Sequence, residues 1–371
     1  MADRILSMDI FQAMECFAPR KLAYDWDNVG LQVGSFHKDV KKVMVTLDVL
    51  ESVVDEAIDK QVDLIIAHHP LLFKPVKQLN TESVQGRIVE KLMKHDITVY
   101  AAHTNLDAAN GGVNDMLCDT IGITDRKILR EEYSEKLVKY SVYVPKSHAD
   151  AIREALAQAG AGHIGNYSHC TFQTEGQGTF KPLAGTSPYI GSTNELTKTE
   201  EVKIETIVLE ATIENVVRIV NDKHPYEEPA YDIYPLKNKG QTHGLGRIGA
   251  LSAEMTLNDF SEHVKTVLEV PHVRVTGDMT KSVKTVAVLG GSGEKYIHDA
   301  IAKGADAYIT GDITFHVAQD AWQLGLAVID PGHHVEKVMK QGVKQYLEQQ
   351  FDQQRLDVIV SETNTEPFRF V

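Results

Sequence analysis

The chain has 371 residues, of which 43% are hydrophobic and 24% are charged, a composition typical of a soluble globular protein. Its length predicts two or three domains rather than a single core. The formal net charge of −14 argues against nucleic acid as the main partner, although a single nucleotide needs only a local basic patch.

The sequence also lacks the patterns of membrane and secreted proteins. It has no apolar run long enough to cross a bilayer and no signal-peptide pattern in its first residues. Its three cysteines, Cys16, Cys118 and Cys170, are widely separated and form no Cys-x-x-Cys pair. We therefore expect a cytoplasmic protein without a membrane partner, a structural zinc knuckle or a disulfide framework.

The first third of the chain alternates helices and strands. A helix is expected at residues 7–17, and an ordered turn containing Asp27 and Asn28 leads into a strand before Gly34. This alternation predicts a parallel or mostly parallel sheet covered on both faces. Further strands are expected at 43–48, 64–68 and 97–102, and further helices at 50–60, 83–95 and 112–121.

The middle of the chain follows a different order, βαββαβ, which is that of the ferredoxin-like fold. Its strands are expected at 136–144, 200–209 and 230–234, its helices at 148–159 and 213–224, and a hairpin-like stretch at 170–180. Alternation then returns, with strands at 283–289, 306–309, 327–329 and 356–360 and helices at 294–303, 314–323 and 335–349.

The alternation in the two outer parts of the chain and the βαββαβ order of its middle predict an α/β fold with a discontinuous domain. Residues 1–127 and 244–371 would form a two-part α/β core with mostly parallel sheets. Residues 128–243 would form a smaller α+β domain inserted into that core. Such an insertion is compatible with domain structure, because the ends of a domain often lie close together at its surface.

Side chains able to bind a metal follow the buried strand in the first third of the chain. The apolar run Leu64–Ala67 is followed by His68, His69 and Pro70, and Pro70 stops sheet pairing because it lacks a backbone donor. Adjacent side chains within a strand point to opposite faces, but at a strand end both imidazoles can reach one site. From this stretch alone, metal ligation and ordinary backbone hydrogen bonding are equally good interpretations.

Two further strand ends carry similar side chains. His103 and Asp107 follow one strand, and His333 and Glu336 follow another with a spacing that places them on one helix face. Strand ends in an α/β fold converge at one sheet edge, so these groups predict a mixed imidazole and carboxylate site for Zn, Mn or Fe. Such a ligand set exceeds one tetrahedral zinc and favours two ions bridged by Glu336. The alternative is a set of scattered structural histidines.

Five segments give the chain a specific resemblance to a known family. They are Trp26–Gly34, Ala67–Phe73, His103–Asp107, Thr310–Asp312 and Asp330–His333. In this order they resemble the GTP cyclohydrolase I type 2 homologues, also called the NGG-interacting-factor-three-like proteins. The stretch His224–Pro229, within the expected insert, is similar to the PII/CutA-like domain of the longer bacterial members.

The resemblance implies both a metal site and an assembly. It implies a dinuclear site of two divalent transition-metal ions per subunit and a toroidal homohexamer. Carried over residue by residue, the metal ligands would be His68, His69, Asp107, His333 and Glu336.

One departure from the family pattern leaves a ligand undecided. Some members place the last glutamate four residues after the histidine, where this chain has Lys337. His333 and His334 therefore both remain candidates. Only His333 lies three residues before Glu336 and shares a helix face with it, which favours His333.

Other residues are candidates for roles beside the metal ligands. His103 could bind metal or orient a ligand, and either His103 or His316 could move a proton in catalysis. Thr310, Asp312 and His316 could line the same pocket, although Asp312 could equally cap the helix that contains His316. A glycine-rich run after a late strand could hold phosphate on its backbone amides, although a tight structural turn is an equal alternative. This run consists of Gly290, Gly291, Ser292 and Gly293.

The residues and the resemblance together predict a metal-dependent hydrolase. Zinc is the first choice of metal, and iron and manganese are the alternatives. The family name suggests hydrolytic ring opening of GTP, with a nucleotide or another small phosphorylated ligand as the partner. A dinuclear pocket would serve phosphoester or amide hydrolysis equally well. The competing interpretation is a non-catalytic regulatory or metal-handling hexamer.

Overall fold

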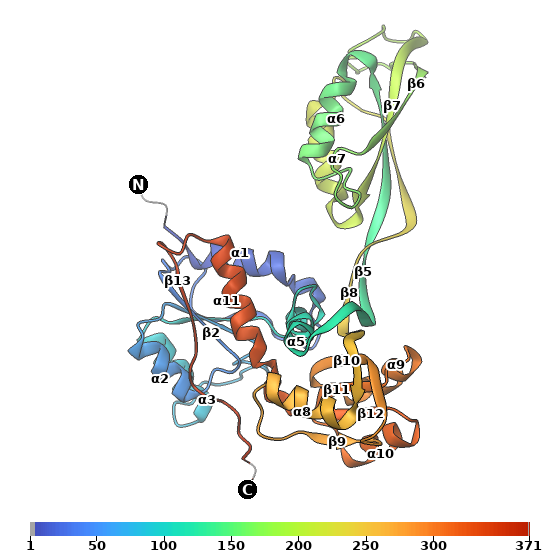
Figure 1. The fold of residues 1–371 in the computed structure, drawn as a ribbon. Helices are drawn as coiled ribbons and strands as arrows, with labels where there is room; N and C mark the ends of the chain where they lie inside the picture. Colours follow the sequence, from blue (N-terminus) through green and yellow to red (C-terminus); the bar gives the residue numbers. More distant parts are fainter. Residues whose placement is uncertain (1–3, 370) are drawn as a thin grey trace. The chain divides into compact units, whose positions relative to one another are not determined.

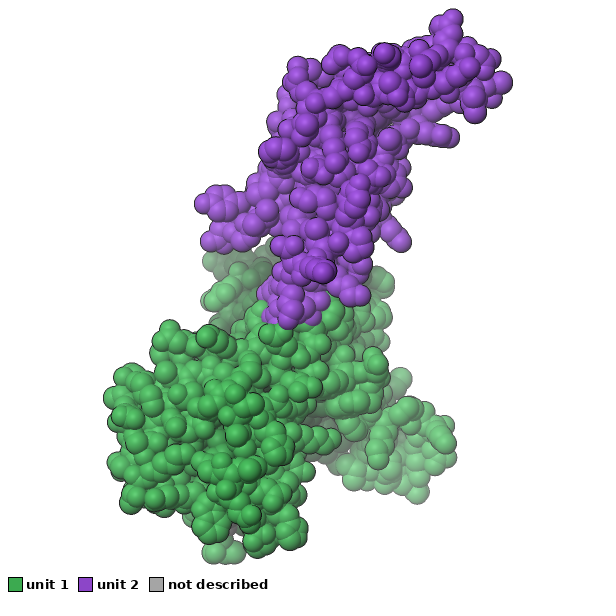
Figure 2. Space-filling model, turned by 90° about the vertical axis from the view of Figure 1, so that its right-hand side faces the viewer, with its two compact units in different colours: residues 1–133, 243–371 green, residues 134–242 purple. Residues whose placement is uncertain are grey.

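The computed structural model describes residues 4–369 and residue 371. The chain forms two compact units, which Figure 2 shows in separate colours. Unit 1 consists of the residues up to Tyr133 together with His243–Val371, and unit 2 consists of Ser134–Thr242. Two long strands, β5 (Ile123–Pro145) and β8 (Tyr231–Thr256), contribute residues to both units.

Unit 1 contains a five-stranded sheet built from short apolar strands (Figure 1). The β1–β4 pairing is antiparallel, and the other three pairings are parallel. All residues of β3 and β4 are buried, as expected for strands covered on both faces. The order is β1 (Gly30–Val33), β4 (Thr98–Ala101), β3 (Leu64–Ala67), β2 (Lys42–Thr46) and β13 (Asp357–Val360).

Two hydrophobic clusters cover the two faces of this sheet, because alternate strand residues point in opposite directions. Leu64 and Ile66 of β3 belong to the cluster that also contains residues of α1 and α11. Ile65 belongs to the cluster that also contains residues of α2 and α3. These helices span Ser7–Phe17 (α1), Val338–Gln350 (α11), Glu51–Asp59 (α2) and Val84–Lys94 (α3).

The second sheet has the order β6-β7-β5-β8-β10-β11-β12-β9. In its unit 1 part, β10–β11 and β11–β12 are parallel, whereas β8–β10 and β12–β9 are antiparallel. The predicted α/β class is therefore confirmed as a mixed α/β fold with two sheets. The strands are β10 (Ser282–Ser292), β11 (Ala307–Gly311), β12 (Ala327–Asp330) and β9 (Arg274–Thr276).

The remaining helices of unit 1 are short and, apart from one 3₁₀ helix that precedes β1, lie between strands in the chain. Within the described residues, no helix is long and apolar enough to cross a membrane. The α-helices are α4 (Thr104–Ala108), α5 (Val113–Ile121), α8 (Leu257–Val267), α9 (Ile297–Ala302) and α10 (Phe315–Gln323). The 3₁₀ helices are η1 (Arg20–Leu22), η4 (Glu294–Tyr296) and η5 (His333–Lys337).

Unit 2 has the element order βαββαβ, with the strand order β6-β7-β5-β8. The β5–β7 and β6–β7 pairs are antiparallel. A separate hydrophobic cluster joins Tyr140 and Ile204 of the strands to Ile152 and Val216 of the helices. The elements between β5 and β8 are η2 (Lys146–His148), α6 (Ala149–Gln158), β6 (Thr171–Phe180), β7 (Thr197–Leu209), η3 (Glu210–Thr212) and α7 (Ile213–Lys223).

Two strands are much longer than their sequence patterns indicate. The alternation at 136–144 and 230–234 marks only parts of β5 and β8. Most residues of β5 before Lys136 are exposed or half-buried, so they show no apolar alternation. A strand held mainly by backbone pairing leaves little hydrophobic signal in the sequence.

Candidate metal centre

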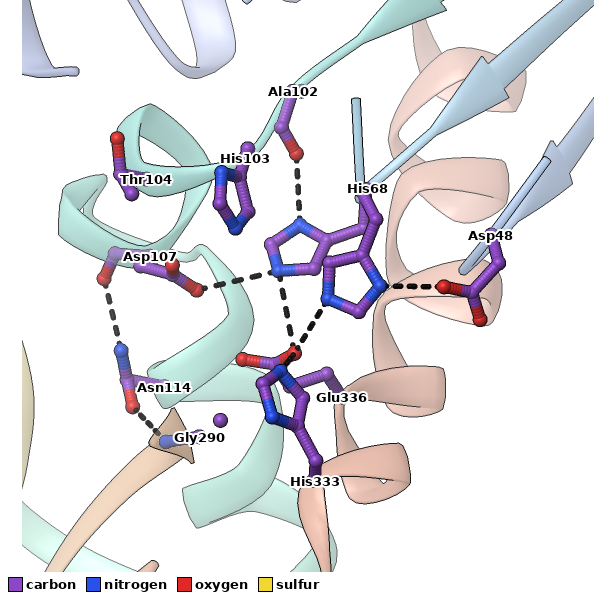
Figure 3. Close-up of polar contacts among 12 residues, drawn as sticks. Asp48, His68, Ala102, His103, Thr104, Asp107, Asn114, Gly290, His333 and Glu336 are labelled. Atoms are coloured by element: carbon purple, nitrogen blue, oxygen red, sulfur yellow. Dashed lines mark hydrogen bonds and ion pairs between the residues drawn. The ribbon is translucent and has the colours of Figure 1, made fainter. Parts of the chain in front are cut away.

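Three segments of unit 1 that follow strands bring imidazoles and carboxylates together (Figure 3). The first two segments follow β3 and β4, which are parallel neighbours, so their ends lie side by side. The third follows β12 of the second sheet. The side chains in the cluster are His68, His69, His103, Asp107, His333 and Glu336.

His68 is fully buried, and one of its ring nitrogens faces only acceptor atoms. Its Nδ1 donates to the Ala102 carbonyl oxygen at 2.8 Å, which leaves a lone pair on Nε2 of the neutral ring. That Nε2 lies 3.6 Å from Asp107 Oδ1 and 3.7 Å from Glu336 Oε2. Among the residues that the structure describes, neither His68 Nε2 nor Asp107 Oδ1 has a hydrogen-bond partner. A proton or a cation between them would satisfy both of these acceptors.

His69 lies between two carboxylates. Its Nδ1 is 2.7 Å from Asp48 Oδ1, and its Nε2 is 3.1 Å from Glu336 Oε2. Thr365 holds Asp48 in turn by donating from Oγ1 to Oδ2 at 2.5 Å. Burial works to lower the pKa of His69, but the hydrogen bonds to Asp48 and Glu336 outweigh burial and raise it to about 10.

His333 and Glu336 are aligned by a short 3₁₀ helix, η5. Residues three apart eclipse one another in such a helix, and here His333 Nε2 lies 3.2 Å from Glu336 Oε2. Gly332 precedes the helix with φ of 88° and ψ of 161°, a conformation that is open essentially only to glycine. His333 Nδ1 is 2.7 Å from Asp312 Oδ2. The bonds to Glu336 and Asp312 raise the pKa of His333 to about 9.

Glu336 is the residue shared by the whole cluster. It is only 3% exposed, and its Oε2 is within 3.7 Å of the Nε2 atoms of three histidines. Gly291 of β10 permits this placement, because a Cβ there would lie 2.5 Å from Glu336 Oε1. Burial raises the pKa of Glu336, but the charge of His68 and the hydrogen bonds from His333 and His69 together hold it well below its usual range.

Asp107 lies on the short helix α4 rather than directly at a strand end. Asn114 holds its backbone by donating from Nδ2 to the Asp107 carbonyl oxygen at 2.9 Å, and Asn114 Oδ1 accepts from Gly290 N at 3.0 Å. Burial raises the pKa of Asp107 to about 6, and the charge of His68 only partly opposes this shift. Asp107 Oδ1 has no hydrogen-bond partner among the described residues, so it is a further candidate ligand atom for a cation.

His103 lies beside the ligand cluster and is oriented by Asp27. Its Nδ1 is 2.9 Å from Asp27 Oδ1, and Asp27 also accepts from Thr104 Oγ1 at 2.5 Å. Burial works to raise the pKa of Asp27, but these hydrogen bonds lower it to about 2. A ring nitrogen of His103 lies within 4.8 Å of ligand atoms of His68 and His69.

Two candidate histidines from the sequence lie outside the cluster. His334 turns away from it, and its Nε2 lies 3.2 Å from Thr365 Oγ1. The structure therefore brings His333, and not His334, to the candidate ligands. His316 is exposed on α10, where its Nδ1 lies 3.3 Å from Gln319 Oε1. The geometry gives His316 no place next to the other candidate residues.

The glycine-rich run begins in β10, which ends at Ser292, and its first two glycines pack against Glu336. The Gly290 amide donates to Asn114 Oδ1 at 3.0 Å, and the Gly293 amide donates to Thr310 Oγ1 at 2.9 Å. These two amides are therefore not free for phosphate, contrary to the phosphate-binding interpretation. Gly291 lies against Glu336, and Ser292 is a β10 residue in register with Gly311 of β11. The geometry favours the structural alternative for this run.

Two carboxylates that contact the cluster were not predicted from the sequence. Asp48 lies two residues after the end of β2, so the strand-end pattern that identified His68 could also have identified Asp48. Asp27 lies in a turn, and its pairing with His103 depends on residues 76 positions apart. Sequence spacing carries no signal for such a contact.

The residues present fit a metal centre. Three groups of side chains have ligand atoms within 4.8 Å of one another, and two of these groups contain Glu336. Each of His69, His103 and His333 has its Nδ1 next to a carboxylate, the arrangement by which proteins orient metal-binding imidazoles. The mixture of imidazole and carboxylate donors suits transition metals.

Comparisons with known proteins identify the family of this α/β chain. The family model described as Duf34/NIF3 (NGG1p interacting factor 3) matches residues 6–367. A Bacillus subtilis (strain 168) protein named GTP cyclohydrolase 1 type 2 homolog is 51% identical over 373 residues, which cover 100% of both chains. The chain therefore belongs to the Duf34/NIF3 family, which confirms the resemblance found in the sequence.

Solved structures support the same assignment. The crystal structure of a Bacillus cereus protein related to NIF3 has a TM-score of 0.92 and 49% sequence identity, with 100% of both chains covered. A Staphylococcus aureus protein of known crystal structure has a TM-score of 0.84 and 34% identity, again over 100% of both chains. The fold therefore matches along the full length of the chain.

Proposed function

We propose that the cluster holds two divalent transition-metal ions and that the protein is a metal-dependent hydrolase. The observation that carries this proposal is that His68 Nε2 and Asp107 Oδ1, which lie 3.6 Å apart beside Glu336, have no hydrogen-bond partner among the described residues. Buried acceptors that face one another cost free energy unless a positive group lies between them.

The ligand atoms fall into two sets that share one carboxylate. One set is His68, Asp107 and Glu336, and the other is His69, His333 and Glu336. Glu336 is therefore suited to bridge two ions, with zinc as the first choice and iron or manganese as alternatives. Such ions, when bound, lower the pKa of a coordinated water toward about 7 and so supply hydroxide at neutral pH.

Residues around the ligands orient them and move protons. Asp48 and Asp312 hold His69 and His333 through Nδ1, which directs Nε2 toward Glu336. His103 is held in the same way by Asp27, and 17% of its side chain is exposed. Its second ring nitrogen can therefore take a proton from, or give a proton to, a substrate that reaches the site.

Relatives supply the specific candidate for the reaction. Because they are named GTP cyclohydrolase 1 type 2 homologs, hydrolytic opening of the GTP ring with release of formate is the reaction to test first. Zinc-loaded wild type should release formate from GTP, Asp107→Ala should lose both metal and turnover, and His103→Gln should keep metal but turn over more slowly. If wild type neither releases formate nor cleaves a panel of phosphoesters, the hydrolase proposal fails. A metal-binding regulatory role would then be preferred.

We also propose a cytoplasmic toroidal homohexamer with a PII/CutA-like inserted domain at residues 128–243. Support for the inserted domain comes from the βαββαβ order and separate hydrophobic cluster of unit 2. Replacing Ser134–Thr242 with a short flexible linker should leave a folded, metal-binding chain. Insoluble or metal-free products from every linker tested would refute the insertion. Sedimentation of the full chain tests the hexamer.

A further inference from the structure

Two large aromatic side chains lie exposed beside the candidate metal centre. Trp26 and Phe73 expose 58% and 45% of their surfaces, and their ring centroids are 5.8 Å apart. We call Trp26 and Phe73 the aromatic pair. Scattered exposed aromatics are ordinary on protein surfaces, but two in contact next to convergent polar groups have the composition of a small-molecule site.

The two segments that carry the aromatic pair are joined by hydrogen bonds. Asn28 Nδ2, near Trp26 in the chain, donates to the Leu72 carbonyl oxygen at 2.6 Å. The Leu72 amide, next to Phe73, donates to Gln32 Oε1 at 3.1 Å. The rings are therefore held by ordered backbone, which reduces the entropy lost when a ligand binds.

The turn that carries Trp26 is also fixed with respect to the cluster. Asp27, the next residue, binds His103 Nδ1 and the Thr104 hydroxyl. Tyr24 stacks against Trp26 with a centroid distance of 5.5 Å and an interplanar angle of 16°. Tyr24 thus backs one face of the indole, and the exposed part of Trp26 remains accessible to another ring.

His103 connects the aromatic pair with the candidate ligands. Its ring centroid lies 6.3 Å from the centroids of both Trp26 and Phe73. On the other side, it lies 5.3 Å from the His68 centroid and 5.6 Å from the His69 centroid. A ring bound against the aromatic pair would therefore be separated from the candidate ligands only by the imidazole of His103.

We propose that the aromatic pair is a stacking platform that holds a planar heteroaromatic ring of the substrate at the metal centre. The rings of the aromatic pair are inclined at 65°, so the bound ring would stack on the π-face of one of them and meet the other in an edge contact. Its edge heteroatoms would face His103. An aliphatic substrate would gain only general hydrophobic contact from these side chains. This inference rests on the proposed hydrolase function, for which it names the substrate class.

The chain offers a direct optical test, because its two tryptophans are Trp26 and Trp322. Trp322 lies on α10 and is 61% exposed, so Trp322→Phe should fold normally and leave Trp26 as the sole tryptophan. Guanosine, titrated into the zinc-loaded full-length variant, should quench tryptophan fluorescence with a saturable curve. Ribose should leave the fluorescence unchanged. An unchanged signal with guanosine, or equal quenching by ribose, would overturn the platform.

A second variant separates stacking from folding. In the Trp322→Phe background, Phe73→Leu should weaken guanosine binding about tenfold, since base–aromatic stacking has this typical size. Bound zinc should be unchanged. The matched control is Phe315→Leu, which alters another exposed phenylalanine, on α10, and should leave guanosine affinity unchanged. Equal guanosine affinity with and without Phe73→Leu overturns the inference.

The same measurements distinguish this inference from the proposed function. A protein that binds zinc but gives no guanosine response refutes the platform and leaves the metal centre standing. If the protein binds guanosine but takes up no metal, the metal-dependent function is refuted. The aromatic pair is then supported as a binding site for a heteroaromatic ring. A changed sedimentation coefficient in Phe73→Leu would assign the pair to a subunit contact and overturn the inference.

Discussion

Two buried histidines, His68 in unit 1 and His224 in unit 2, use their ring nitrogens differently. His224 Nε2 lies 3.0 Å from the Tyr143 carbonyl oxygen, and its Nδ1 accepts from the Tyr226 amide at 3.1 Å, so both nitrogens have partners. His68 has a partner only on Nδ1, as far as the described residues show. Hydrogen bonding, rather than burial, therefore distinguishes a structural histidine from a candidate ligand.

The pKa shifts of these two histidines have opposite directions. Burial lowers the pKa of His224, and no carboxylate is among the causes of its shift. Burial acts in the same direction on His68, but Asp107 and Glu336 outweigh it and raise the pKa. The surroundings of His68 therefore favour a positive charge, whether it is carried by a proton or by a metal ion.

The largest expected effect comes from removing the shared carboxylate of the cluster. Glu336→Gln keeps the side-chain volume but removes the charge that faces three histidines. We expect metal affinity to fall more than about 100-fold. This exceeds the loss that is typical when a residue hydrogen-bonded to a metal ligand is removed. Elemental analysis of protein purified without chelator measures the remaining metal. His316→Gln, on α10, is the matched control and should retain full occupancy; full occupancy in Glu336→Gln would contradict the assignment.

A smaller effect is expected from Asp312, which contacts only Nδ1 of the candidate ligand His333, the ring nitrogen that does not face Glu336. Asp312→Asn tolerates the observed φ of 56° but removes the charge beside His333 Nδ1. Metal affinity should fall by roughly 10–100-fold. Competition with a chromophoric chelator measures this change. The exposed Asp320→Asn on α10 provides the control, and equal affinities in both variants would mean that Asp312 does not support the ligand.

Sequence reasoning predicted most of the cluster because its residues follow strands. His68 and His69 follow a strongly apolar strand, and parallel neighbours must end at the same edge. Spacing also distinguished His333 from His334, because only residues three apart are aligned with Glu336. Local patterns were therefore sufficient where chain direction alone determines the position of a side chain.

Contacts between distant segments could not be predicted in this way. The pairing of Asp27 with His103 and the bond from Thr365 to Asp48 join residues far apart in the chain. The long strand β5 was found only where its residues alternate in burial. In each case the determining factor is tertiary packing, which a local pattern does not encode.

The comparison between His68 and His224 can also be tested by replacing His224 of unit 2. His224→Leu removes two hydrogen bonds and leaves the Tyr143 carbonyl oxygen without this donor. We expect a loss of about 1–3 kcal/mol in the free energy of unfolding, measured in urea, and unchanged metal content. His163→Ala alters an exposed histidine of the same unit and should cost little. A loss of metal in His224→Leu would break the proposed distinction.

A last prediction extends the comparison from histidines to carboxylates. Glu56 of α2, unlike Asp107, is surrounded by donors. Its oxygens accept from Lys60 Nζ, the Glu362 amide and the hydroxyls of Ser361 and Thr363. Burial works to raise the pKa of Glu56, but these bonds lower it from 4.5 to about 2.

Because this pKa is lower in the folded chain, the ionised Glu56 stabilises the fold at neutral pH. That contribution is fully present above pH 4.5 and disappears as the pH falls toward 2. Glu56→Gln should therefore lose about 1–3 kcal/mol of unfolding free energy at pH 7, and its deficit relative to wild type should shrink between pH 5 and about 2. Urea unfolding of both proteins across this pH range measures the deficit. Glu90→Gln, which removes an exposed ion pair with Lys94, should show a small deficit at pH 7. A Glu56→Gln deficit that stays constant down to pH 2 would show that the carboxylate acts through its shape and not through its charge.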